Sequence, residues 1–149
     1  YSIDGFSYFS KSLKLNGSLS YVKGDENETY GPMPSISPIF GTISGEYTKD
    51  KIKISALYKF SGDKSPKDYS LGGEDGLEET PVITENSNGI IYAGTPKWSD
   101  FSIYTNYDIS EDVKIRIALT NIFDNHYRTF ASGISAPGRS FQIGLYLKL

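Results

Sequence analysis

The sequence predicts an all-β chain that folds as an antiparallel up-and-down meander of about seven strands. Three observations predict this fold: apolar and polar residues alternate with a period of two, short and long connections follow one another in turn, and positive charges gather on one face of the strands. Aromatic residues make up 14% of the chain and 15 residues are glycine, which favours strands joined by many turns.

Alternation defines six strand segments, and a seventh strand is expected near residues 3–9 without a clear register. Successive side chains of a strand point to opposite faces, so each row of alternate, mostly apolar residues marks one face. In chain order the rows are Leu13, Leu15, Gly17, Leu19 and Tyr21; Gly41, Ile43, Gly45 and Tyr47; Ile52, Ile54, Ala56, Tyr58 and Phe60; Phe101, Ile103, Thr105 and Tyr107; Val113, Ile115, Ile117, Leu119 and Phe123; and Phe141, Ile143, Leu145, Leu147 and Leu149.

The connections alternate strictly in length. Short turns are expected at 10–12, 48–50 and 108–112, and long loops at 24–38, 61–98 and 124–140. In a meander this places all short turns at one end and all long loops at the other, as in outer-membrane barrels. Loops beyond about 12–15 residues are uncommon in compact soluble domains. The pattern therefore favours the wall of a barrel.

The two faces of the strands differ as the inside and outside of a membrane barrel do. In lipid only a closed barrel pairs every strand N–H and C=O, so its outside is apolar and its inside polar. Aromatic residues of the apolar rows lie near strand ends, as at membrane–water interfaces. The alternative is a soluble sheet whose apolar face is a core. Cations on the polar face are Lys14, Lys51, Lys53, Lys59, Lys114, Arg116 and Lys148.

Composition and charge argue against several classes of protein. The net charge of −3 and the lack of a basic stripe argue against nucleic acid. Cysteine is absent, which excludes disulfides and thiolate metal sites. No apolar run approaches the ~18–20 residues of a spanning helix. The chain opens at Tyr1 without a signal peptide, so we expect a piece of a longer protein.

A motif in the last third of the chain resembles the final strand–loop–strand of TonB-dependent outer-membrane receptors. A weaker similarity, in Pro32-Met33-Pro34 and in Gly94-Thr95-Pro96 followed by Trp98, extends the resemblance over most of the chain. Family members usually end in Phe or Trp, whereas this chain ends at Leu149. The matching residues are Asn121, Ile122, Phe123, Asp124, Tyr127, Pro137, Gly138, Arg139 and Phe141.

The resemblance implies that residues 1–149 are the C-terminal segment of a 22-stranded transmembrane β-barrel in the bacterial outer membrane, without its plug domain. The parent would import siderophore-bound iron, haem, cobalamin or another nutrient with TonB-delivered energy. Its partners would be outer-membrane lipid, the remaining barrel and plug, TonB through the absent N-terminal part, and a small-molecule or metal-chelate cargo. Alternatives are a passive porin, another outer-membrane barrel, or a soluble β-sandwich ligand-binding module.

The motif residues have a structural interpretation. Asn121 and Asp124 would cap the turning backbone at a strand end, Pro137-Gly138 would fix a tight turn, and Phe141 would open the lipid-facing row. On the polar face, residues expected to meet the plug or the transit path are Glu46, Lys53, Tyr104 and Arg116.

We predict no enzyme activity, catalytic residue, metal site or cofactor. His126 is the only histidine and lacks partners for a metal site, and Ser132 and Ser135 have no histidine at a recognisable spacing. Candidate cargo contacts in the extracellular loops are Tyr69, Tyr92, Trp98, His126 and Arg128. The acidic loop residues are expected to be solvated, with calcium binding as an alternative; they are Asp25, Glu26, Glu28, Asp63, Asp68, Glu74, Asp75, Glu78, Glu79 and Glu85.

Overall fold

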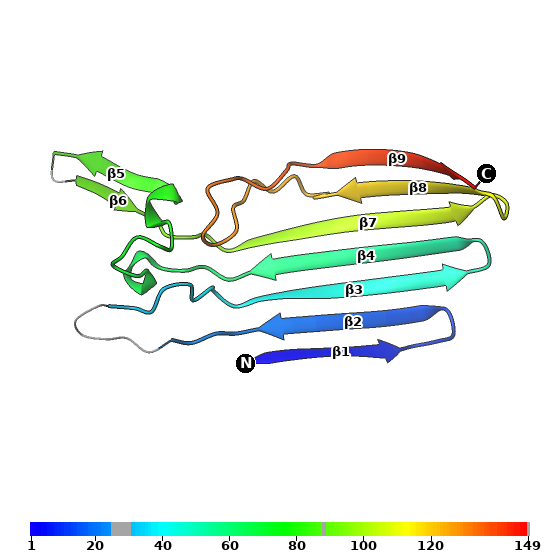
Figure 1. The fold of residues 1–149 in the computed structure, drawn as a ribbon, viewed down its shortest axis with the longest axis horizontal. Helices are drawn as coiled ribbons and strands as arrows, with labels where there is room; N and C mark the ends of the chain where they lie inside the picture. The colour runs from blue at the N-terminus through cyan, green and yellow to red at the C-terminus, as the bar shows by residue number, and fades with distance from the viewer. Residues whose placement is uncertain (25–30, 88, 149) are drawn as a thin grey trace.

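A seven-stranded antiparallel sheet forms the body of the chain (Figure 1). The computed structural model describes residues 1–24, 31–87 and 89–148, so Asp25, Glu26, Glu28 and Leu149 lie outside the described residues. The strand order is β1-β2-β3-β4-β7-β8-β9, which confirms the predicted meander. The strands are β1 (Ser2–Tyr8), β2 (Leu13–Ser20), β3 (Phe40–Lys49), β4 (Ile52–Ser61), β7 (Trp98–Asp108), β8 (Val113–Thr120) and β9 (Ser140–Leu147).

Strand pairing aligns the rows that alternation predicted. On one face Leu15, Gly45, Ala56, Ile103, Leu119 and Phe141 are successive partners across β2 to β9. One residue further along, the line runs through Lys14, Glu46, Ser55, Tyr104, Ala118 and Gln142. Because the side-chain period of a strand is two, these neighbouring lines belong to opposite faces of the sheet. The sheet therefore has one apolar and one polar face.

The register of β1, which the sequence left open, comes from its pairing with β2. Ile3 pairs with Leu19 and so lies on the apolar face. Phe6 and Tyr8 share the polar face with Lys14, whose Nζ lies 4.9 Å and 5.7 Å from the centres of their rings. The polar face thus carries two aromatic rings at this edge.

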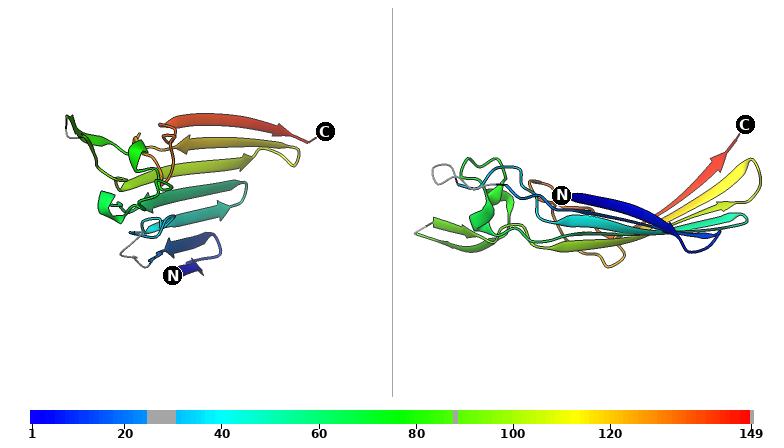
Figure 2. Two further views of the ribbon diagram at one scale, coloured as in Figure 1. Left: turned by 60° about the vertical axis from the view of Figure 1, so that its left-hand side comes forward. Right: turned by 90° about the horizontal axis from the view of Figure 1, so that it is seen from below.

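The apolar face is uncovered. Figure 2 shows the sheet edge-on as a single curved layer. Ile43, Ile143 and Leu145 are 54%, 67% and 61% exposed, and among the described residues the only buried apolar ones are Tyr69 and Ala118. A water-soluble sandwich would cover such a face with a second sheet. The structure therefore lacks the core that the soluble alternative requires.

Glycine on the apolar face lets side chains cross between strands. Gly41 of β3 pairs with Phe60 of β4. A Cβ on Gly41 would lie 2.5 Å from the Ser18 carbonyl oxygen and 2.8 Å from Cζ of Phe60. The Phe60 ring therefore covers bare backbone of the neighbouring strand, and no larger residue fits there without displacement.

The long connections lie at one end of the sheet and the short ones at the other, as predicted (Figure 1). We call residues 21–39, 62–97 and 121–139 the first, second and third loops. The second loop contains a hairpin of β5 (Val82–Asn86) and β6 (Gly89–Tyr92), and the short 3-10 helices η1 (Pro66–Asp68) and η2 (Leu77–Glu79). Within the described residues, no helix is both long enough and apolar enough to cross a membrane.

The hairpin and one strand end differ from the prediction. The sequence predicts only a long loop at 61–98, and the hairpin inside it was not predicted, although two β-branched runs flank an Asn-Gly pair at 88–89, a common hairpin signal. The predicted row through Phe123 is also too long, since β8 ends at Thr120. Asn121 has a φ of 47°, in the left-handed region, so the strand cannot continue through it.

On the expectation that the apolar face meets lipid, we predict that Ile143→Lys lowers the free energy of unfolding of the full-length protein in lipid vesicles by about 2–4 kcal/mol, because the new charge would face hydrocarbon. The neighbouring Gln142→Lys, on the polar face, should change it by less than about 1 kcal/mol. Denaturant titration in lipid vesicles measures both. Equal losses for the two variants would contradict the assignment of the faces.

Candidate functional site

The exit from β8 and the start of β9 are tied together by motif residues. Asn121, 2% exposed, donates from its amide to the carbonyls of Asn125 (2.9 Å) and Pro137 (3.0 Å), and its side-chain oxygen accepts from the Asn125 N–H (3.0 Å). Asp124 has a φ of 56° and accepts from the Arg139 N–H at 2.7 Å. These side chains supply hydrogen bonds that the turning backbone lacks.

The remaining motif residues lie on both sides of this turn. A Cβ on Gly138 would lie 3.0 Å from Oδ1 of Asp124, so glycine keeps the two segments close. Phe123 stacks on Phe101 with ring centres 6.0 Å apart. Phe123 and Phe141 are 65% and 66% exposed. Both rings are therefore free to contact surroundings outside the chain.

Tyr127 connects the third loop to the polar face of the sheet. Its hydroxyl donates to Oδ2 of Asp100 at 2.8 Å, and its ring stacks on Trp98 with centres 4.3 Å apart. Asp100 also accepts from the Ser102 hydroxyl (2.9 Å) and lies 3.3 Å from Nζ of Lys59. Burial, together with the Asp100 carboxylate, raises the pKa of Tyr127 to about 12. The phenol therefore stays neutral and remains a donor.

Trp98 has an unusual environment. Its indole Nε1 is buried, and it is the one such side-chain polar atom without a hydrogen-bond partner in the described parts of the chain. An unpartnered buried donor costs free energy. Trp98 lies against Tyr127 and is half-buried, so only part of its ring could meet a ligand.

A largely buried cluster, here called the loop core, consists of residues from the second and third loops. Its members are Lys64, Tyr69, Asp75, Thr95 and Phe130. Lys64 and Asp75 form an ion pair of 3.0 Å, with side chains 5% and 1% exposed. Tyr69 is 3% exposed, bonds its hydroxyl to Oγ1 of Thr95 at 2.5 Å, and packs edge-on against Phe130.

The loop core corrects two expectations. Asp75 was expected to be a solvated loop charge, but it is buried. Burial alone would raise its pKa, yet hydrogen bonds from the Ser35 N–H, the Lys64 ammonium and the Ser70 N–H together hold the pKa below its ordinary value. Tyr69, a candidate cargo contact, is packed inside the loops, and burial raises its pKa.

A pocket of about 380 Å³ lies between the second and third loops. His126, Tyr127 and Arg128 line one side, and Glu79 and Lys97 are among the residues from the second loop. Nη1 of Arg128 donates to the Glu79 carbonyl at 2.8 Å and lies 3.6 Å from its carboxylate. A volume of this size suits a small organic ligand or part of a larger one.

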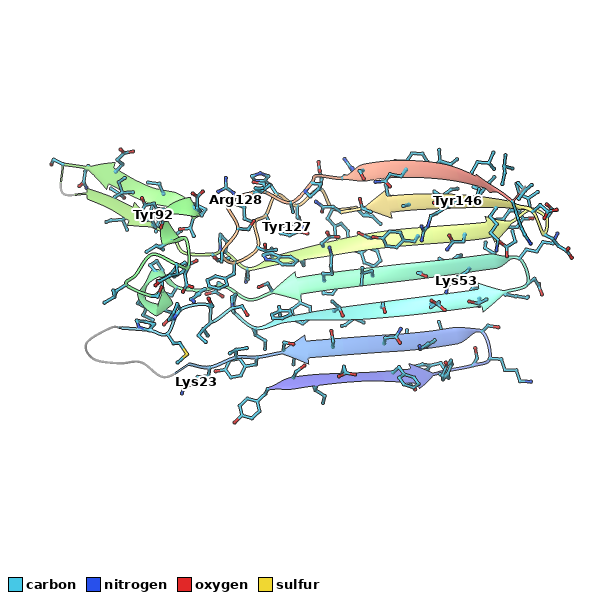
Figure 3. The ribbon with its side chains drawn as sticks, viewed as in Figure 1. Lys23, Lys53, Tyr92, Tyr127, Arg128 and Tyr146 are labelled. Atoms are coloured by element: carbon cyan, nitrogen blue, oxygen red, sulfur yellow. The ribbon has the colours of Figure 1, made fainter. Side chains whose placement is uncertain are left out.

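The structure therefore brings two of the five sequence candidates into one pocket. His126 and Arg128 line it, whereas Trp98 does not and stacks on the Tyr127 ring. Tyr92 does not line it either, and Figure 3 shows it on the β5–β6 hairpin, away from Tyr127 and Arg128. Lys97 and Tyr127 also line the pocket, and sequence reasoning did not assign them to it. Among the described residues, no group of three or more His, Cys, Asp or Glu side chains could hold a metal ion.

We predict that Tyr127→Phe destabilises the full-length protein by about 1.5–3 kcal/mol, because a buried charged acceptor loses its hydrogen bond while the stacked ring remains. Denaturant unfolding in detergent measures the change. Tyr92→Phe is the matched control, since the Tyr92 hydroxyl makes no hydrogen bond with the described residues, and it should have almost no effect. Similar losses for both variants would refute the role of the Asp100 contact.

We predict that the loop core loosens in acid. The folded pKa of Asp75 lies below the ordinary value of 3.8, so its ionised form contributes stability above that pH, and this contribution disappears as pH falls through the lower folded pKa. Amide hydrogen exchange of residues 64–76, between about pH 5 and pH 2 and corrected for intrinsic rates, measures the change. If the exchange rates of residues 64–76 depend on pH equally in Asp75→Asn and in the unchanged protein, the effect does not come from the Asp75 carboxylate.

No family model and no curated protein matches the sequence. Several solved structures match its fold. The copper transporter OprC gives a TM-score of 0.71 at 16% identity and is matched over 98% of this chain and 22% of its own. The ferric enterobactin receptor PfeA of Pseudomonas aeruginosa, in complex with enterobactin, gives a TM-score of 0.68 at 19% identity. The match covers 97% of this chain and 21% of the receptor chain.

The FrpB iron transporter of Neisseria meningitidis gives a TM-score of 0.68 at 11% identity, over 97% of this chain and 22% of its own. The chain thus spans about a fifth of the length of the structures it matches. These neighbours are two transporters and a receptor. The fold of this chain is that of a wall segment of the TonB-dependent receptor barrel, as its C-terminal motif predicted.

Proposed function

We propose that residues 1–149 form the C-terminal wall segment and part of the extracellular cap of an outer-membrane active transporter. The observation that carries the proposal is a single-layer sheet with an uncovered apolar face, a polar opposite face and the fold of a receptor barrel. An apolar face of this kind is stable against hydrocarbon and aggregation-prone in water. A location in the bacterial outer membrane follows from this reasoning.

The free edges of the sheet support a larger parent. Within the described residues, β1 pairs only with β2, and β9 pairs only with β8. In hydrocarbon the unpaired N–H and C=O groups of both edges would each cost several kcal/mol, so further strands must cover them. We infer that the rest of the barrel wall pairs with both edges, and that a plug domain and the TonB-contacting segment belong to the remainder of the parent.

The polar face would line the interior of that barrel. Lys53 and Glu46 form an ion pair of 2.8 Å there. Arg116 pairs with Asn106 and Gly144 across the sheet and has no carboxylate partner among the described residues. Tyr104 lies on the same face. These side chains are available to a plug domain or to a passing ligand.

The pocket between the second and third loops is the surface that we propose for contact with cargo. It lies at the loop end of the sheet and offers Arg128, His126 and Lys97 as donors. Two proline rings, of Pro81 and Pro96, add apolar surface. Such a lining suits an organic ligand with acceptor oxygens, including metal chelates. The neighbours named above handle copper, ferric enterobactin and iron, which are the first cargoes to test.

We predict that cells which produce the full-length protein take up copper or ferric enterobactin, and that this uptake depends on TonB. Loss of TonB should reduce uptake at least tenfold, because active import needs energy from the inner membrane. Radiolabelled uptake in paired strains with and without TonB measures this. Uptake that is unchanged without TonB would favour a passive porin and contradict the proposal.

A further inference from the structure

The ion pair in the loop core is far more buried than other ion pairs of the described residues. The Lys64 and Asp75 side chains are 5% and 1% exposed, whereas Lys53–Glu46 and Lys114–Asp108 have both partners more than a third exposed. Removing two charges from water is costly and is tolerated only when their remaining hydrogen-bonding capacity is used. What those charges contact therefore indicates what the pair does.

Lys64 reaches all three loops from its place at the start of the second. Its Nζ donates to the Ile36 carbonyl of the first loop at 2.6 Å and to Asp75 of its own loop at 3.0 Å. The same atom lies 4.1 Å from the centre of the Phe130 ring, which belongs to the third loop. A desolvated ammonium over an aromatic face is attracted to it. One side chain thus holds a group from each loop.

Asp75 makes the second connection to the first loop. Its Oδ1 accepts from the Ser35 N–H at 2.7 Å, and its Oδ2 accepts from the Ser70 N–H at 3.4 Å. Ser35 has a φ of 62°, a left-handed conformation that is unfavourable for serine. The carboxylate therefore helps to hold a strained backbone that would otherwise relax.

The base of the second loop fixes Lys64 itself. Lys64 and Thr95 exchange backbone hydrogen bonds of 2.9 Å and 3.0 Å across the two ends of that loop. Gly94 precedes Thr95 with a φ of 76°, and any Cβ there would collide with the Lys64 carbonyl oxygen. Only glycine permits this close approach. Lys64 is thus anchored where the second loop leaves the sheet.

The loop core also borders the pocket. Thr95, which bonds to Tyr69 inside the core, lines the pocket as well. Phe130 lies in the segment 126–132, whose other members form the third-loop side of the pocket. A displacement of this segment would therefore change the pocket directly.

We propose that Lys64 and Asp75 are positioning residues that join the three loops into one body and so fix the walls of the pocket. The loops then move together, not as independent flaps. The importance of this positioning for cargo rests on the function proposed above, but the coupling of the loops is tested without any cargo.

The first test is hydrogen exchange in the full-length protein in detergent. In Asp75→Asn the first-loop segment 33–38 and the third-loop segment 128–133 should exchange at least about tenfold faster, together with residues 64–76. The matched control is Glu85→Gln, an exposed carboxylate of the same loop that forms no ion pair with the described residues, and it should change none of these segments. Faster exchange confined to residues 64–76 would overturn the proposal.

A milder variant keeps the test decisive if Asp75→Asn does not fold. Phe130→Leu leaves the Lys64–Asp75 pair intact and removes only the ring beside the ammonium. It should speed exchange in 128–133 and leave 33–38 protected, because the first loop is held through Ser35 and Ile36. Unchanged protection of 128–133 would overturn the proposal.

A distance measurement reads the same coupling directly. The chain has no cysteine, so spin labels can be placed at Met33→Cys in the first loop and Ile134→Cys in the third, both exposed positions. The interlabel distance distribution should be narrow with the native pair, broaden at least twofold in Asp75→Asn, and stay narrow in Glu85→Gln. Equal distribution widths in the native-pair protein, Asp75→Asn and Glu85→Gln would refute the coupling of the loops, whether or not TonB-dependent uptake is found. A failure of uptake would contradict the proposed function and would not change the result on loop coupling.

Discussion

Backbone hydrogen bonding between neighbouring strands is the interaction on which the rest of this structure depends. The described residues contain almost no buried apolar side chains, since only Tyr69 and Ala118 qualify, so an ordinary hydrophobic core does not hold the sheet together. In the hydrocarbon setting proposed above, no water would compete for the N–H and C=O groups, and a complete ladder would be obligatory. The proposal that further strands pair with β1 and β9 rests on this requirement.

Burial in this chain is inverted relative to a soluble domain. The buried side chains are mostly polar and lie where the strands meet the loops, as with Asp100, Ser102 and Asn121. Each of these has hydrogen-bond partners, which is the condition for burying a polar group without a large loss of stability. Satisfied polar networks thus order the rim of the sheet in the place of apolar packing.

The loops use the same device on a larger scale. The second loop is long, but its ends are joined through Lys64 and Thr95, and Lys64 reaches both other loops. A loop that is held at its base and through a buried charge has far less conformational freedom than a free loop of the same length. The second and third loops thus form a defined pocket, lined by Glu79 and Arg128, that the sequence does not predict.

The sequence by itself determined the strand pattern, the two faces and the ends at which turns and loops lie, because a period of two and turn residues are local properties. It also pointed to the barrel through the motif from Asn121 to Phe141. Only the tertiary structure decided the register of β1, the burial of Asp75 and the pocket around Arg128. These depend on contacts between residues far apart in the chain, such as Lys64 with Ile36, and loops have no periodicity that would reveal such contacts.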